Sequence, residues 1–318
     1  MLNIKTVSYP NLAWESAANI IFPPGFDEKK KYAAVLCAHP IGSCKEQTAG
    51  NIYGAALAQA GFVVLAFDAS FQGASGGEPR MVEDPGLRVG DFRFAVDYLV
   101  TLPYIDEERI GALGVCGGGG YVVNATMTEH RIKAVTSVTG VNFGRLVRES
   151  FTQFDPVTAM TAMGKQRTAE ARGMKGVAMD LLPISNEDAK KQGQTDPDIV
   201  QATDYYRSRC PNPHGQAKQL FSFNAAATTW DAFNHVEILL TQPALIIVGD
   251  IPGAFGAYRD SLELYGRASG SKDRQLVVLP NTSHYELYDQ PNATGPALEK
   301  IIPFFNEHLG CSGGSAAL

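Results

Sequence analysis

One cysteine of this sequence stands in a setting that favours nucleophilic chemistry. Cys116 lies at the centre of Gly114-Val-Cys-Gly-Gly118, between a predicted strand at residues 110–115 and a predicted helix at 117–128. Glycines two residues before and after a nucleophile permit a tight strand-to-helix turn that holds it in a strained backbone conformation. The helix N-terminus favours negative charge, so we expect it to support a thiolate and an oxyanion. The pattern predicts a cysteine nucleophile; the alternative is a core thiol beside packing glycines.

A nucleophile on such a turn needs a histidine that comes later in the chain, on a loop after a strand. Of the six histidines, His284 fits this description best, because it follows the predicted strand at 275–279. His214 and His235 fall in a different region and remain open as substrate contacts. We therefore predict His284 as the general base.

The same arrangement needs an acid between the nucleophile and the histidine. Asp250 follows the predicted strand at 243–248 and is our first choice to orient the imidazole, with Asp260 as the second. The usual spacing in hydrolases places the acid three residues after Gly249, where this chain has Pro252. The alternative for Asp250 is a turn carboxylate that binds its own loop.

Acyl transfer also requires hydrogen-bond donors for an oxyanion. The backbone N–H of Gly117, directly after the nucleophile, is one expected donor. The other should come from the loop His39-Pro-Ile-Gly-Ser43, which follows the predicted strand at 33–38. We predict the N–H of Ile41 there, with Gly42 as the alternative.

Other chemistries do not fit the sequence. The glycine run at 117–120 lacks the third glycine of a dinucleotide fingerprint, and the next strand does not end in the acid that would bind a ribose. There is no P-loop pattern. The five cysteines contain no C-x-x-C pair, which argues against a disulfide framework or a zinc ribbon. We predict no cofactor and no metal, and a small-molecule acyl substrate.

The elements that must position these residues alternate between strand and helix. Residues 4–9 and 14–22 predict an antiparallel pair of strands. Further strands are predicted at 33–38, 62–67, 110–115, 132–138, 243–248 and 275–279, and helices at 46–60, 89–102, 117–128, 254–267 and 295–309. Such alternation predicts an α/β fold with a mostly parallel sheet and a site at the carboxyl ends of its strands.

The alternation is interrupted once. Residues 143–238 carry helix-start signals such as Asp155-Pro156 and Asp196-Pro197 and no convincing strand, which predicts a helical cap inserted over the strand ends. We therefore divide the chain into a core at 1–142 and 239–309, the cap at 143–238, and a disordered tail at 310–318.

Composition limits the partners. The chain has 318 residues, 45% hydrophobic, with 27 Lys+Arg against 33 Asp+Glu and a net charge of −6. Without clustered cations, binding to nucleic acid is not expected. No apolar run approaches the roughly 18 residues of a membrane span, and the N-terminus does not resemble a secretory signal. The sequence predicts a cytoplasmic protein with no membrane partner and leaves a homo-oligomer open.

Three segments together resemble a known family. They are residues 38–48, AHPIGSCKEQT; residues 66–80, AFDASFQGASGGEPR; and residues 111–121, GALGVCGGGGY. They are similar to the cysteine-nucleophile α/β-hydrolases, above all to bacterial hydrolases related to fungal polyketide acyltransferases, and more distantly to dienelactone hydrolases. The resemblance implies the α/β-hydrolase fold and a triad of Cys116, Asp250 and His284.

The predicted activity is hydrolysis of an ester, lactone or thioester through a covalent acyl-cysteine. An acyltransferase that passes the acyl group to an alcohol or amine is the first alternative, and a non-catalytic binding protein on the same fold is the second. A cysteine peptidase is a third. Aromatic residues of the predicted cap suit either an acyl chain or a helical core: Phe151, Phe154, Tyr205, Tyr206 and Trp230.

Overall fold

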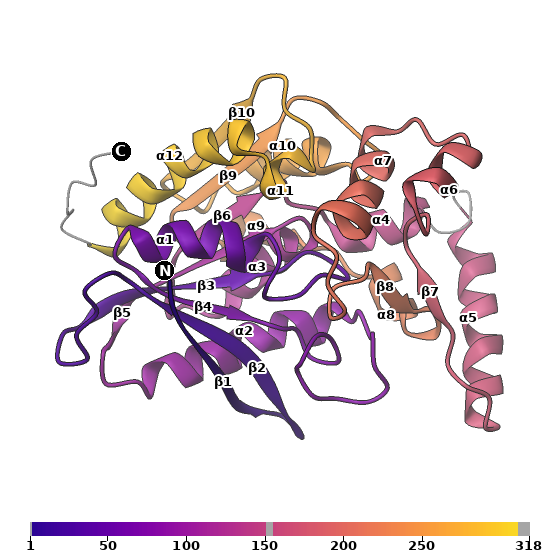
Figure 1. Cartoon of the computed structure of the whole chain (residues 1–318), viewed down its shortest axis with the longest axis horizontal. Coiled ribbons are helices and arrows are strands. Elements are labelled where there is room, and N and C mark those ends of the chain that lie inside the picture. Colours follow the sequence, from indigo (N-terminus) through magenta and orange to yellow (C-terminus); the bar gives the residue numbers. More distant parts are fainter. Residues whose placement is uncertain (1, 151–154, 311–318) are drawn as a thin grey trace.

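A single eight-stranded sheet forms the centre of the molecule (Figure 1). The computed structural model describes residues 2–150 and 155–310. The strands lie in the order β1-β2-β4-β3-β5-β6-β9-β10. Their bounds are β1 Asn3–Asn11, β2 Trp14–Phe22, β3 Tyr32–Ala38, β4 Val63–Phe67, β5 Ile105–Val115, β6 Ile132–Val138, β9 Ala244–Gly249 and β10 Arg274–Leu279. From β4 to β10 neighbouring strands are parallel, whereas β1 and β2 are antiparallel, so the mostly parallel α/β fold is confirmed.

Helices cover both faces of the sheet. Their bounds are α1 Ala55–Gln59, α2 Pro85–Val100, α3 Gly117–Thr128, α9 Val236–Leu239, α10 Ala257–Arg267, α11 Glu286–Asp289 and α12 Pro291–Leu309. Along β3, Ala34 and Leu36 pack into the core beneath α2 and α3, while Val35 and Cys37 pack into the core beneath α1 and α12. Strands buried on both faces explain the uninterrupted apolar runs in the sequence.

Aspartate followed by proline begins three of the helices. Asp84 and Asp196 each accept hydrogen bonds from two backbone N–H groups of the helix they precede, and Asp155 accepts one. Proline in the first turn has no N–H to leave unpaired. The starts predicted at 155 and 196 therefore coincide with true N-caps.

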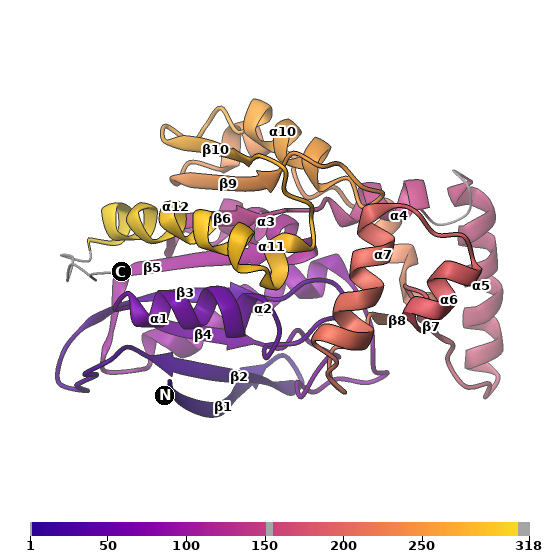
Figure 2. The same cartoon turned by 45° about the horizontal axis from the view of Figure 1, so that its top comes forward.

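Most of the segment between β6 and β9, from α4 to α8, lies at one end of the sheet in both views (Figures 1 and 2). Its helices are α4 Phe143–Ser150, α5 Pro156–Ala171, α6 Asn186–Lys191, α7 Pro197–Asp204, η2 Tyr205–Arg209, η3 Phe221–Phe223 and α8 Ala225–Thr228. It also contains a two-stranded antiparallel sheet of β7 Ala178–Asp180 and β8 Lys218–Leu220, so the prediction of no strand in this segment was wrong. Each strand has three residues, too few to show an alternating pattern in the sequence.

Two further expectations differ from the structure or fall outside it. The helix predicted at 46–60 begins later, as the π-helix η1 Ala49–Gly54 followed by α1. The N–H and ammonium of Lys45 both bind Asp68, which holds the preceding residues in a loop. The predicted tail lies outside the described residues, except for Gly310. Among the residues described, no helix combines the length and the apolar character needed to cross a membrane.

Candidate active site

Cys116 stands on a sharp turn between β5 and α3. Its backbone has φ 56° and ψ −125°, a conformation that is strained for a residue with a side chain. Its N–H donates to Val138 O at 3.0 Å, and its carbonyl accepts the N–H of Val141 at 2.9 Å. A Cβ at Gly118 would lie 2.5 Å from the carbonyl oxygen of Ala38, and one at Gly114 would overlap the Gly118 carbonyl. The turn is therefore possible only because glycines surround it.

Two backbone N–H groups face the Cys116 thiol. Burial raises the pKa of this thiol to about 11, and the Tyr288 side chain and the N–H groups of Gly117 and Ile41 oppose that rise. The Ile41 side chain also packs directly over Gly117. These two N–H groups are the predicted oxyanion donors, and the interaction of the Ile41 N–H with the thiol supports Ile41 as the second donor.

The loop that carries Ile41 is held by the buried His39. One ring nitrogen of His39 contacts the carbonyl of Pro40 at 2.7 Å, and the other accepts the N–H of Ala69 at 3.0 Å. Arg88 donates to the His39 carbonyl at 2.7 Å. His39 thus supports the loop next to Cys116 through its ring and its backbone.

His284 lies in the loop between β10 and α11 and is only 4% exposed. Its ring is 4.9 Å from that of Tyr285 and 5.5 Å from that of Tyr288, centroid to centroid. The same two tyrosines are close enough to Cys116 for a thiolate to raise their pKa. Within residues 2–150 and 155–310, neither ring nitrogen of His284 has a hydrogen-bond partner, and burial lowers its pKa to about 3. The imidazole is therefore neutral near pH 7.

The two predicted acids do not pair with this histidine. Asp250 is exposed, and its Oδ1 accepts the N–H of Thr282 at 3.1 Å. Asp260 is fully buried and binds Arg145 through both carboxylate oxygens, at 2.7 and 2.8 Å. Asp250 therefore links two loops at the strand ends, and Asp260 joins α10 to α4.

A different acid shares a cavity with His284. Asp198, in the first turn of α7, is 1% exposed and lines a small cavity together with His284. The Asp196-Pro197 pattern predicts a helix start and gives no sign that Asp198 belongs to a site. Its position in the predicted cap, far from any predicted strand end, gave no reason to place it near His284.

Cys116 lies in the wall of a cavity of about 590 Å³ at the junction of the sheet and the inserted segment. Its lining is mainly apolar and includes Ile41, Phe143, Leu146, Met179, Leu181, Leu182, Ile199, Tyr206, Phe255 and Tyr285. Of the aromatic residues considered for substrate contact, Tyr206 lines this cavity, whereas Tyr205 and Trp230 pack in the core. Phe151 and Phe154 lie outside the described residues. A cavity of this size and lining suits an apolar small molecule.

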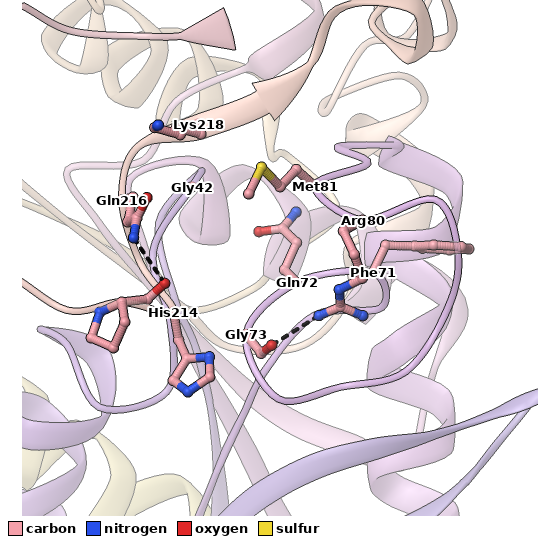
Figure 3. Close-up of a pocket in the computed structure, with 10 residues that line it drawn as sticks. Gly42, Phe71, Gln72, Gly73, Arg80, Met81, His214, Gln216 and Lys218 are labelled. Atoms are coloured by element: carbon pink, nitrogen blue, oxygen red, sulfur yellow. Dashed lines mark hydrogen bonds between the residues drawn. The ribbon is translucent and has the colours of Figure 1, made fainter. Parts of the chain in front are cut away.

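A second pocket, of about 210 Å³, lies beside Gly42 (Figure 3). Its cationic side chains already have partners. Arg80 donates to the carbonyl of Gly73 at 2.8 Å, and Lys218 pairs with Asp180 at 3.7 Å. We therefore place the chemistry in the larger cavity, which contains the candidate nucleophile.

Among the described residues, two groups of side chains have the composition of a metal site. One, Cys44, Glu46 and Asp68, already surrounds the Lys45 ammonium, which lies 2.8 Å from each of the two carboxylates. The other, Asp273, Glu307 and His308, lies at the surface end of α12 and contains an Asp273–His308 contact of 2.8 Å. Neither group lines the cavity at Cys116.

Comparison with known proteins identifies the family. Residues 88–204 match the family described as BAAT / Acyl-CoA thioester hydrolase C terminal. The chain is 39% identical over 300 residues to the uncharacterized protein YcjY of Escherichia coli, covering 92% of this chain and 94% of YcjY. It is 27% identical over 322 residues to the polyketide transferase claH of Penicillium crustosum, covering 98% and 100%.

A solved structure has the same fold. The crystal structure of the hypothetical protein PA2218 from Pseudomonas aeruginosa superposes with a TM-score of 0.84 at 28% identity, covering 96% of this chain and 94% of that one. The fold is that of an α/β-hydrolase, and the family match assigns the chain to the esterase- and thioesterase-like class. This chain belongs to the α/β-hydrolase family that contains YcjY and PA2218, and the predicted kinship with fungal polyketide transferases is confirmed.

Proposed function

We propose that this protein is an acyl-transfer hydrolase that uses Cys116 as its nucleophile and His284 as its base. The observation that carries the proposal is the position of Cys116: a strained turn, opposite two backbone N–H groups, in the wall of a large apolar cavity. Strain of this kind persists where the surrounding structure enforces it, which is typical of functional sites.

The protonation states favour general-base catalysis over a preformed ion pair. The raised pKa of the Cys116 thiol and the lowered pKa of His284 keep both groups neutral near pH 7. The imidazole then takes the thiol proton as the sulfur attacks the carbonyl carbon. The N–H groups of Gly117 and Ile41 hold the oxyanion, and the imidazolium returns the proton to the leaving group.

A thioester between the acyl group and Cys116 results. Water, deprotonated by His284, attacks this thioester, and collapse of the second tetrahedral intermediate releases the acid and the free thiol. The substrate class is a small molecule with an apolar acyl group, in an ester, lactone or thioester. Asp250 is the third member of the triad that the sequence predicts, and its exposed carboxylate accepts the N–H of Thr282.

Acyl transfer to an alcohol or amine is the alternative, favoured by the likeness to a polyketide transferase over nearly the whole chain. The chemistry is the same until the second step, at which an acceptor replaces water. Cavity shape decides which nucleophile reaches the thioester, so product analysis with added acceptors distinguishes the two activities.

Intact-mass spectrometry with a panel of activated acyl esters tests the proposal. We expect one acyl group per wild-type chain, absent in Cys116→Ala and formed far more slowly in His284→Ala. Cys210→Ala is the matched control, because Cys210 is a partly exposed thiol outside the cavity lining, and it should acylate like the wild type. Wild-type protein that stays unmodified across all chain lengths would favour a non-catalytic binding protein.

A further inference from the structure

Asp198 is a buried carboxylate with one oxygen unsatisfied. Its Oδ2 accepts the N–H of Phe255 at 2.8 Å, whereas its Oδ1 has no hydrogen-bond partner among the described residues. Burial raises the pKa of this carboxyl to about 6. An unpaired oxygen in such surroundings is costly, and buried polar atoms without a partner are uncommon in proteins. Asp198 therefore lacks a donor.

His284 also lacks hydrogen-bond partners. Both of its ring nitrogens are buried without a partner among the described residues. Asp198 and His284 line the same cavity, whose volume is only about 10 Å³. That volume is about the least that holds one water molecule. A small movement, or one water, would join them.

The loop after β9 is shaped to receive acids from α7. Asp196 accepts the N–H of Ala254 at 3.1 Å, next to the Phe255 N–H that binds Asp198. A Cβ at Gly253 would overlap the carboxyl group of Asp198. The preceding residue, Pro252, occupies the position at which hydrolases of this fold usually carry their acid. The loop thus lacks that acid and leaves space for a carboxylate from α7.

We propose that Asp198 is the positioning residue that completes the site, its free Oδ1 accepting a hydrogen bond from one ring N–H of His284 while the other ring nitrogen faces Cys116. This inference rests on the proposed function. A carboxylate in that place selects one imidazole tautomer and stabilises the imidazolium that forms when the Cys116 proton is taken.

In this arrangement, helix α7 connects substrate binding to catalysis. Ile199, the next residue of α7, lines the apolar cavity at Cys116. An acyl chain that fills this cavity therefore contacts the helical turn that carries Asp198. The third member of the site would come from the inserted segment, and not from a strand end of the sheet.

Steady-state kinetics with an activated acyl ester compare three Asp→Asn variants. Asp198→Asn should lower kcat at least about 100-fold with KM within threefold, because an amide favours the wrong tautomer. Asp196→Asn is the matched control, since Asp196 caps the same helix, contacts the same loop and is absent from the lining of the His284 cavity; we expect kcat within threefold. If Asp250→Asn loses kcat and Asp198→Asn does not, the assignment is overturned.

Gly253→Ala provides a second test that keeps the carboxylate. Its new Cβ must push Asp198 away, so we expect at least a tenfold loss of kcat, while Gly266→Ala, with open space around it, stays within threefold of the wild type. Normal kcat in a folded Gly253→Ala variant would contradict the proposal. This variant also covers the case in which Asp198→Asn does not fold.

Histidine ¹⁵N spectra distinguish failure of this inference from failure of the proposed function. The His284 ring signals, identified by their loss in His284→Gln, should shift in Asp198→Asn and remain unchanged in Asp196→Asn. A shift without any acylation of Cys116 would support the Asp198–His284 contact and reject the activity. Acylation of Cys116 with unchanged His284 signals in Asp198→Asn would reject the contact alone.

Discussion

At the scale of single residues, burial governs the chemistry of Cys116 more than the helix behind it does. The sequence predicts support for a thiolate from the N-terminus of α3, yet the pKa of the thiol is raised to about 11 because the side chain is desolvated. His284 is affected in the opposite direction, since burial disfavours its charged form. Near pH 7 the Cys116 thiol and the His284 imidazole are therefore both neutral, so in the proposed mechanism charge appears only during the reaction.

Alkylation of Cys116 should follow this raised pKa. The thiolate fraction of a group with pKa about 11 falls tenfold for each unit of pH below it. We expect the rate of modification by iodoacetamide to rise about tenfold per pH unit from pH 7 to 10, measured by peptide mass spectrometry. Rapid alkylation with a plateau below pH 7 would indicate a thiolate–imidazolium pair and contradict the expectation.

At the scale of elements, the turn between β5 and α3 depends on close backbone contacts. Gly118 lies against the carbonyl oxygens of the loop that follows β3, and Gly114 lies against Gly118. These contacts bring the N-terminus of α3 up to the loop that carries Ile41. The glycine spacing in the sequence is thus a packing requirement of two neighbouring strands.

Gly118→Ala should destabilise the protein, because its Cβ would lie 2.5 Å from Ala38 O and 2.7 Å from His39 O, both backbone atoms. We expect a loss of about 1–3 kcal/mol in the free energy of unfolding, measured by urea denaturation. Gly90→Ala is the control: it lies within α2 with no atom near the new Cβ and should be neutral or stabilising, by up to about 1 kcal/mol. Equal effects at both positions would contradict the packing argument.

The ion pair between Arg145 and Asp260 joins α4 to α10. Asp260 also accepts the N–H of Asn142, and its side chain is fully buried. Asp260→Asn should cost about 3 kcal/mol of unfolding free energy, because it leaves a buried arginine with Glu149 as its remaining carboxylate partner. Urea denaturation measures this cost.

Glu299→Gln, on the exposed side of α12, is the control and should change the unfolding free energy by no more than about 0.5 kcal/mol. The activity of folded Asp260→Asn should stay within threefold of the wild type. A loss of activity without a loss of stability would restore Asp260 as a candidate acid.

At the scale of the whole molecule, the sheet and the inserted segment enclose the cavity at Cys116 together. Ile41 and Cys116 come from the sheet side, and Met179, Leu182 and Ile199 from the inserted segment. In the proposed reaction the sheet side supplies the nucleophile and the oxyanion donors, while the inserted segment supplies much of the apolar wall of the cavity.

Acyl chain length should control the rate. Each methylene buried in the cavity contributes about 0.8 kcal/mol, so we expect kcat/KM for p-nitrophenyl esters to rise about fourfold per methylene until the cavity is full. Leu182→Trp should shift the optimum to shorter chains by filling the cavity. Ile238→Trp, at a residue 72% exposed and outside the lining, should leave the optimum unchanged. A rate independent of chain length would contradict acyl binding in this cavity.

The sequence by itself determined the sheet, the order of its elements and the turn at Cys116, because strand burial, N-cap aspartates and glycine spacing are local patterns. The sequence did not predict the short strands β7 and β8, because three residues are too few to show the alternation of apolar and polar residues that marks a strand. The partner of His284 depends on contacts between residues far apart in the chain. Asp250 has the expected sequence position but an exposed carboxylate, whereas Asp198 reaches the His284 cavity only because the inserted segment folds back over the loop after β9. Only the tertiary structure could reveal that juxtaposition, because no local spacing encodes it.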